Sequence, residues 1–245
     1  MKTLTTILIL LNLLVPFSMF AAVAYDADSD NLGESTGGDT TQTWTHTPVG
    51  TPSAIIGCGE GSNGTNGDVA SWTYAGAAMT EAVEKSSVNG YAALWRTTAT
   101  PASGAQTTVI TWTNSPTEDR AQGTTISITG GSTLGATGVD ATESGTAPSV
   151  TLSPTPTSTS LLIDCLEVAT ADTTTATSAN GTKYIHNEFH GTAGIAVGAT
   201  WASPTSGVMA YTLGTSRSYG LSAIEITVDA AGGAAAGESV MFMEF

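Results

Sequence analysis

The sequence has few basic residues and few charged residues of any kind. Lys and Arg together number 6, against 21 Asp and Glu, which gives a formal net charge of −15 and an isoelectric point near 4.1. Phosphate backbones and anionic lipid surfaces are bound through clustered Lys and Arg side chains. We therefore expect no nucleic acid partner and no attachment to anionic membrane surfaces.

The sequence also lacks any ten-residue amphipathic pattern of the helical type. Charged residues make up only 11% of the chain, so its solubility depends largely on Thr, Ser, Asn and Gly. Thr suits strands and Gly suits turns, and short alternating or apolar segments are separated by turn residues at close spacing. This pattern predicts an all-β fold, an antiparallel β-sandwich or jelly roll of roughly a dozen strands.

The only long apolar run lies at the N-terminus. It covers residues 4–20 after the basic Lys2, and the small residues Ala22-Val23-Ala24 follow it. These features are typical of a secretory signal peptide, residues 1–24, and an uncleaved membrane anchor is the alternative. We expect a secreted or cell-surface protein with one β-sandwich domain, residues 25–229, followed by an Ala/Gly linker and a short apolar C-terminal segment, residues 230–245.

Residues 158–168 give the strongest strand signal. Leu162, Asp164 and Leu166 would share one face of this strand, and Ile163 and Cys165 would lie on the opposite face with Leu161 and Glu167. An apolar run of this length bounded by Thr, Ser and Pro predicts a central core strand. Two Gly-rich segments, residues 59–67 and 130–147, are predicted to be exposed loops.

Three segments carry a resemblance to a known group of proteins. They are residues 43–48 (TWTHTP), residues 71–80 (SWTYAGAAMT), and residues 101–106 (PASGAQ) through 111–113 (TWT). Together they resemble poorly characterised jelly-roll-like β-sandwich domains of secreted bacterial and phage-tail-associated proteins. The resemblance covers roughly residues 26–229 and implies a fold and a setting at surfaces, and it carries over no catalytic residues.

Cys58 and Cys165 are the only cysteines, and both lie in apolar predicted strands. An even number of cysteines in an exported chain favours a disulfide. Sequence spacing does not show whether the two Cα atoms approach within bonding range, so a pair of buried thiols is the alternative.

Two groups of residues have the spacing of a metal site. Asp26, Asp28 and Asp30 alternate in a way that could surround a calcium ion, although the Gly and Glu positions of an EF-hand loop are not matched; solvated carboxylates on an edge strand are the alternative. In the second group, two imidazoles and a carboxylate at alternate strand positions could bind zinc, and an ordinary solvated strand face is the alternative. Its members are His186, Glu188 and His190. Apart from this possible calcium, no cofactor is expected.

No residue cluster indicates a specific reaction. Asp164 and Glu167 lie in the most apolar strand but on opposite faces, which argues against a glycosidase pair. The sequences at residues 33–37 (GESTG) and 59–64 (GEGSNG) match nucleophile-elbow and dinucleotide motifs, but neither is followed by a predicted helix. Core packing is the expected role of most of the five Trp residues, and Trp201 is the candidate for an exposed ligand contact.

The C-terminal segment could take part in assembly. Val240, Phe242 and Phe245 belong to an apolar stretch that follows the flexible linker. Such a strand could be donated to the sheet edge of another copy, could act as an outer-membrane insertion signal, or could fold back on its own domain.

These observations favour a non-enzymatic, exported structural or adhesion protein. A carbohydrate-binding module is the second interpretation and a secreted hydrolase the third. The expected partners are other copies of the chain, cell-surface components or glycans.

Overall fold

The computed structural model describes residues 22–31, 40–62, 68–86, 90–113, 121–168, 174–176, 182–190, 195–202 and 204–229. Within these ranges the chain forms seventeen β-strands and no helix, and the strands pair antiparallel. The predicted all-β class is confirmed, with more strands than the dozen expected. Since no helix occurs in these ranges, none of their segments could cross a membrane as a helix.

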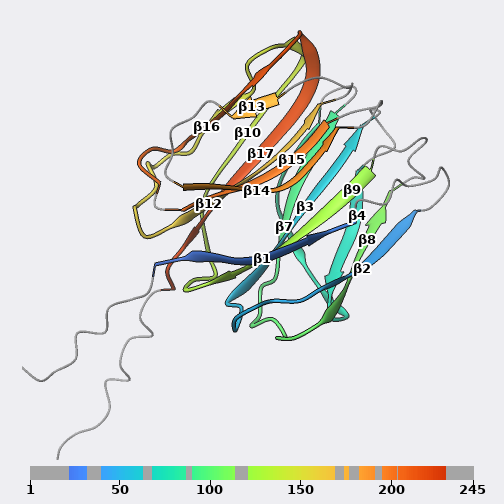
Figure 1. Cartoon of the computed structure of the whole chain (residues 1–245), viewed down its shortest axis with the longest axis vertical. Helices are drawn as coiled ribbons and strands as arrows, with labels where there is room; N and C mark the ends of the chain where they lie inside the picture. The colour runs from blue at the N-terminus through green and yellow to red at the C-terminus, as the bar shows by residue number, and fades with distance from the viewer. Residues whose placement is uncertain are drawn as a thin grey trace, which may run out of the picture.

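Two five-stranded sheets form the middle of the molecule (Figure 1). Inner sheet I has the order β1-β9-β3-β7-β6, with strands Ala24–Asp30 (β1), Ala121–Thr129 (β9), Ala54–Ser62 (β3), Gly90–Arg96 (β7) and Thr80–Ser86 (β6). Inner sheet II has the order β10-β17-β12-β15-β14, with strands Thr133–Gly145 (β10), Arg217–Thr227 (β17), Leu161–Val168 (β12), Ile195–Ala202 (β15) and Thr182–His190 (β14).

Two smaller sheets cover the outer faces of the inner pair. Outer sheet I has the order β2-β8-β4-β5, with strands Thr41–His46 (β2), Gln106–Trp112 (β8), Val69–Tyr74 (β4) and Ala77–Ala78 (β5). Outer sheet II has the order β11-β16-β13, with strands Ser149–Thr151 (β11), Val208–Leu213 (β16) and Thr174–Ala176 (β13). Figure 1 shows the layers in sequence, from β13 and β16 on one side to β2, β4 and β8 on the other.

Three apolar clusters fill the spaces between the four layers. The middle cluster joins the inner sheets and contains both cysteines. One outer cluster packs Trp72, Ile110 and Trp112 of outer sheet I against inner sheet I. The other packs Met209 and Tyr211 of outer sheet II against inner sheet II. The fold is therefore a β-sandwich whose two central sheets are each covered by a further layer.

The four layers explain why the central strands are buried on both faces. All eight residues of β12 are buried, as are eight consecutive residues of β9. Leu162 and Leu166 enter the outer cluster, while Ile163 and Cys165 enter the middle one. The predicted central strand and its two faces are thus confirmed.

Two predicted loops are wrong in part. The chain continues as β3 through Ser62, so Gly59 and Glu60 belong to a buried strand instead of an exposed loop. Most of residues 130–147 forms β10, a thirteen-residue strand at the edge of inner sheet II, paired with β17. Its Gly, Ser and Thr content resembles a loop, but its backbone pairs with β17, with register shifts after Leu134 and after Thr142.

Glycines allow close packing between the layers. A Cβ atom at Gly57 would lie 2.7 Å from the Trp72 indole, and one at Gly123 would lie 2.6 Å from the Trp44 ring. The bare backbone of inner sheet I therefore forms the surface on which these indoles rest. Ala75 and Gly76 form the turn between β4 and β5, and both have positive φ, 52° and 77°, as a two-residue hairpin of the I′ type requires.

The signal-peptide prediction falls mostly outside the described residues, which begin at position 22. Val23 is 3% exposed and packs in the middle cluster. Its backbone N–H donates to the carbonyl of Thr159 at 2.9 Å. Cleavage after Ala24 would remove these contacts.

Candidate functional site

Cys58 and Cys165 form a disulfide between the two inner sheets. Their Cα atoms are 5.8 Å apart, and both residues are buried. Cys58 lies on β3 and Cys165 on β12, each the third of five strands in its sheet. The predicted disulfide is present, and it links the centres of the two facing sheets.

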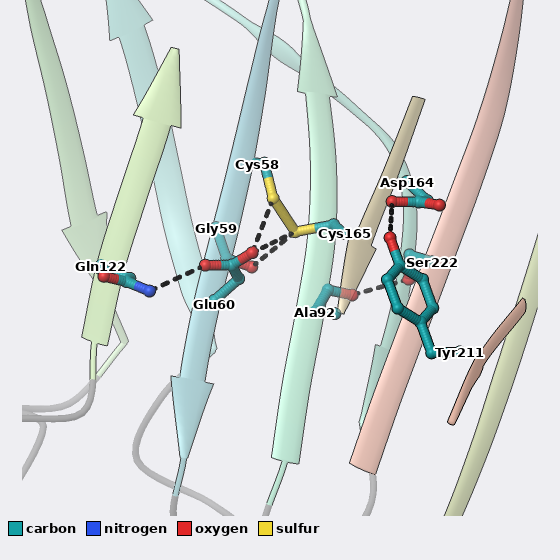
Figure 2. Close-up of a disulfide and its surroundings, with 9 residues drawn as sticks. All are labelled: Cys58, Gly59, Glu60, Ala92, Gln122, Asp164, Cys165, Tyr211 and Ser222. Carbon is teal, nitrogen blue, oxygen red and sulfur yellow. Dashed lines mark hydrogen bonds between the residues drawn. A yellow bond between two sulfur atoms is a disulfide. The ribbon is translucent and has the colours of Figure 1, made fainter. Parts of the chain in front are cut away.

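Strand alternation places both sulfurs in the middle cluster. Ala54, Ile56 and Cys58 are at alternate positions of β3 and face inner sheet II. A second link between the sheets lies nearby, where the Ser222 hydroxyl donates to the carbonyl of Ala92 at 2.7 Å. Figure 2 shows the disulfide between the ribbons of the two sheets, with Ser222 and Ala92 beside it.

The Glu60 carboxyl group contacts the disulfide (Figure 2). Glu60 is two residues after Cys58 on β3, so its side chain enters the same core, where it has no exposed surface. Its Oε1 lies 3.1 Å from the Cys58 sulfur and 3.5 Å from the Cys165 sulfur. Gln122 Nε2, on the neighbouring strand β9, donates to Oε2 at 3.2 Å.

The surroundings of Glu60 favour its neutral form. Burial raises the pKa of the Glu60 carboxyl group well above its ordinary value, and the charges of Asp164 and Asp30 raise it further. The hydrogen bond from Gln122 acts in the opposite direction and lowers this pKa. Desolvation is the largest of these effects, so the carboxyl group retains its proton to a higher pH than an exposed glutamate.

Cross-strand pairing extends the polar surroundings of the disulfide. Glu60 is opposite Gln122, and Cys58 is opposite Thr124, which is in turn opposite Asp30 of β1. The Thr124 hydroxyl oxygen is buried and has no hydrogen-bond partner among the described residues. One end of the middle core is therefore polar around the sulfurs.

Sequence reasoning missed Glu60 because residues 59–67 were assigned to a loop. The signal that could have found it is the alternation Cys58, Glu60 within an extended strand, which puts a carboxyl group on the face of a buried cysteine. Gly59, on the opposite face, suggested a loop but serves to accommodate Val69 and Trp72.

In the described part of the chain, Cys58, Glu60 and Cys165 are the one group of three potential ligands whose atoms lie within 4.8 Å of one another. The sulfurs are joined in a disulfide, so they offer no thiolate to a metal ion. In this state the group is not a metal site.

Asp164 and Glu167 do not form a catalytic pair. Asp164 faces outer sheet II, where the Tyr211 hydroxyl donates to its Oδ1 at 2.7 Å. Glu167 is on the Cys165 face of the same strand, as the alternation of β12 requires. Both residues are buried within the layers. The register of β12 is unbroken between the two residues, which agrees with the prediction that they lie on opposite faces.

Asp26, Asp28 and Asp30 lie on β1, which is an edge strand of inner sheet I as predicted. The pairing of β1 with β9 shifts register between Tyr25 and Ala27, so the regular alternation assumed for a calcium site is interrupted at Asp26. The Asp26 carboxylate accepts from the backbone N–H groups of Val49 and Gly50 and from the Ser127 hydroxyl.

Asp28 accepts a hydrogen bond from the Tyr25 hydroxyl. The three aspartates do not bring three potential ligand atoms within 4.8 Å of one another. In this structure Asp26 secures a turn, and calcium binding by the group stays a prediction.

His186, Glu188 and His190 lie on β14, at the edge of inner sheet II. The pairing of β14 with β15 shifts register between Ile185 and Asn187, so the unbroken alternation behind the zinc interpretation is interrupted at His186. Their side chains lie outside the described part of the structure.

The tryptophans have the expected core role where they are described. Trp72, Trp95 and Trp112 are buried, and Trp44 packs against the same outer cluster. The backbone of Trp201 belongs to β15, but its side chain lies outside the described part. Val240, Phe242 and Phe245 also lie outside it.

An open hollow of about 550 Å³ lies at one end of the inner sheets. Arg96, Asp229, Ser53, Ser132 and residues 97–100 line it. The Arg96 side chain has one hydrogen bond among the described residues, a long contact of 3.4 Å from Nη1 to the carbonyl of Ser132. Asp229 Oδ1 accepts from Ser132 and Thr133, and these bonds lower the Asp229 pKa.

Comparison of the chain with family models, curated proteins and solved structures gives no match.

Proposed function

We propose that this chain is an exported, non-enzymatic β-sandwich protein with a structural or adhesive role outside the cell or at its surface. The observation that carries the proposal is the disulfide that joins the middle strands of the two inner sheets. A disulfide persists in oxidising compartments, and one placed here holds together the two sheets that form the central core.

The polar groups of the core also support a structural role. Asp164 and Glu60 are fully enclosed and engaged by Tyr211 and Gln122, so neither carboxyl group is available to a substrate. The proposed topology is a jelly roll, and the proposed relatives are the secreted and phage-tail-associated domains that the sequence resembles. The proposed partners are other copies of the chain or cell-surface components.

The first test compares mature full-length protein with a form truncated after Asp229, by light scattering and electron microscopy. We expect assemblies in the full-length protein that the truncation abolishes, because the apolar tail would pair with an exposed sheet edge of another copy. A matched full-length control replaces Val240, Phe242 and Phe245 with Ser. Monomers in every form would contradict assembly through the tail.

The hollow beside Arg96 supports a second candidate function, the binding of a neutral saccharide. It has the volume of a small-ligand pocket. Its lining combines guanidinium donors, a carboxylate acceptor and several hydroxyl groups, which together suit adjacent sugar hydroxyls. Titration with neutral disaccharides should shift the amide resonances of residues 97–100, and the shifts should disappear in Arg96→Gln but persist in Arg217→Gln.

A further inference from the structure

The Glu60 carboxyl group lies at an unusual position for a buried acid. Its Oε1 is 3.1 and 3.5 Å from two sulfur atoms that carry no hydrogen while the disulfide is closed. The structure gives this carboxyl group one donor, Gln122 Nε2 at Oε2. A buried carboxylate with a single donor is poorly stabilised, so the closed disulfide favours the protonated acid.

Opening the disulfide would change what Oε1 faces. Each reduced sulfur carries a hydrogen and can donate a weak hydrogen bond, and both sulfurs already lie at bonding distance from Oε1. With Gln122, the carboxyl group would then have three donors in place of one. Donors to the ionised form lower the pKa of a carboxyl group.

We propose that Cys58, Glu60 and Cys165 form one proton-coupled redox unit, in which Glu60 holds a proton while the disulfide is closed and gives it to a cysteine sulfur when the disulfide is reduced. Glu60 is also the group that receives a thiol proton when the disulfide forms. This role is independent of the structural or adhesive function proposed above.

The reaction balances with a dithiol as reductant. The dithiol supplies two electrons and becomes a disulfide, and the bond between the Cys58 and Cys165 sulfurs breaks. One sulfur takes its proton from Glu60 and the other takes one of the two protons of the reductant. The second proton of the reductant is released to solvent, so reduction releases one proton in the pH range where Glu60 changes its ionisation.

Other titratable residues lie on the strands around the unit in both redox states. Asp30 on β1 and Asp164 on β12 both raise the pKa of Glu60, and Glu167 is on the Cys165 face of β12. Strand β14 approaches β1 and β9, and β15 approaches β1 and β3. The sequence of β14 includes Lys183, His186, Glu188 and His190. A variant altered only at Glu60 retains all of these groups, so their titration cancels in a comparison with the wild type.

The first experiment measures the equilibrium constant for reduction of the full chain by dithiothreitol at several pH values from about 5 to 8, below the ordinary thiol pKa of about 8.5. For the wild type we expect the constant to rise up to tenfold per pH unit, because one proton is released. In Glu60→Gln the equilibrium constant for reduction should not change with pH. Glu225→Gln, at a buried acid that accepts from the Ala136 amide, should retain the wild-type slope. A wild-type constant independent of pH would overturn the proposal.

A second measurement needs no reductant. In a Cys58→Ser and Cys165→Ser double variant, two hydroxyl groups can donate to Glu60 in place of thiols. Carboxyl-carbon NMR titration should give a lower Glu60 pKa in this variant than in the disulfide-bonded wild type. Equal pKa values in the two proteins would overturn the proposal.

Discussion

At the scale of single residues, the described structure contains two buried titratable groups with opposite pKa shifts. Burial raises the pKa of Glu60, while burial lowers the pKa of His46 to about 4. His46 Nδ1 lies 2.9 Å from the Ser29 hydroxyl, and its Nε2 has no hydrogen-bond partner among the described residues. Asp28 and Asp26 favour the charged imidazole, but desolvation outweighs them.

The lowered pKa of His46 predicts that the folded protein loses stability in acid. Between about pH 6.5 and 4 the imidazole is protonated in the unfolded chain and neutral in the folded one, so the free energy of unfolding falls as the pH falls through this range. The full effect is roughly 3 kcal/mol. Urea unfolding of the wild type and His46→Gln at pH 7 and 4.5 should show a smaller acid loss in the variant. Equal losses of unfolding free energy in the two proteins would show that His46 does not cause the acid sensitivity.

Glu60 has the opposite effect on how the free energy of unfolding depends on pH. A carboxyl group whose folded pKa is raised favours folding below its ordinary pKa and loses that contribution as the pH rises toward the folded value. The two contributions oppose each other between the ordinary pKa values of Glu60 and His46, 4.5 and 6.5, so their combined optimum lies at mildly acidic pH.

At the scale of elements, the contact between β3 and β4 depends on glycine. The Trp72 indole of β4 lies over Gly57, where an added Cβ would be 2.7 Å away. We expect Gly57→Ala to lower the free energy of unfolding by about 1 to 3 kcal/mol through overpacking. Denaturant titrations should show that Trp72→Leu offsets part of this loss in the double variant. Strictly additive losses would show that the two residues do not share this contact.

At the scale of the whole molecule, the disulfide joins segments 107 residues apart in sequence. In the chain-entropy description, closing a loop of this length stabilises the folded state by about 4 to 5 kcal/mol. We expect the Cys58→Ala and Cys165→Ala double variant to lose stability on this scale, with a clear drop in melting temperature by calorimetry. The single variant Glu225→Gln serves as a control that leaves the disulfide intact. A change below 1 kcal/mol would show that packing alone holds the inner sheets together.

Local patterns in the sequence determined much of the fold. The apolar run and the turn residues around it predicted a strand at residues 158–168, which contains the observed β12, Leu161–Val168, because a strand is short and turns require particular residues. The same reasoning predicted the two faces of residues 161–168 and limited Cys58 and Cys165 to two alternatives.

Only the tertiary structure decided which faces meet. The four layers, the ladder along β10 and the position of Glu60 beside the disulfide depend on contacts between residues far apart in the chain. Strands buried on both faces lose the alternation that reports a single core, and glycines packed beneath Trp72 resemble loop glycines in sequence. Local periodicity therefore specified the strands of this protein, and long-range packing specified the layers and the environment of the buried acid.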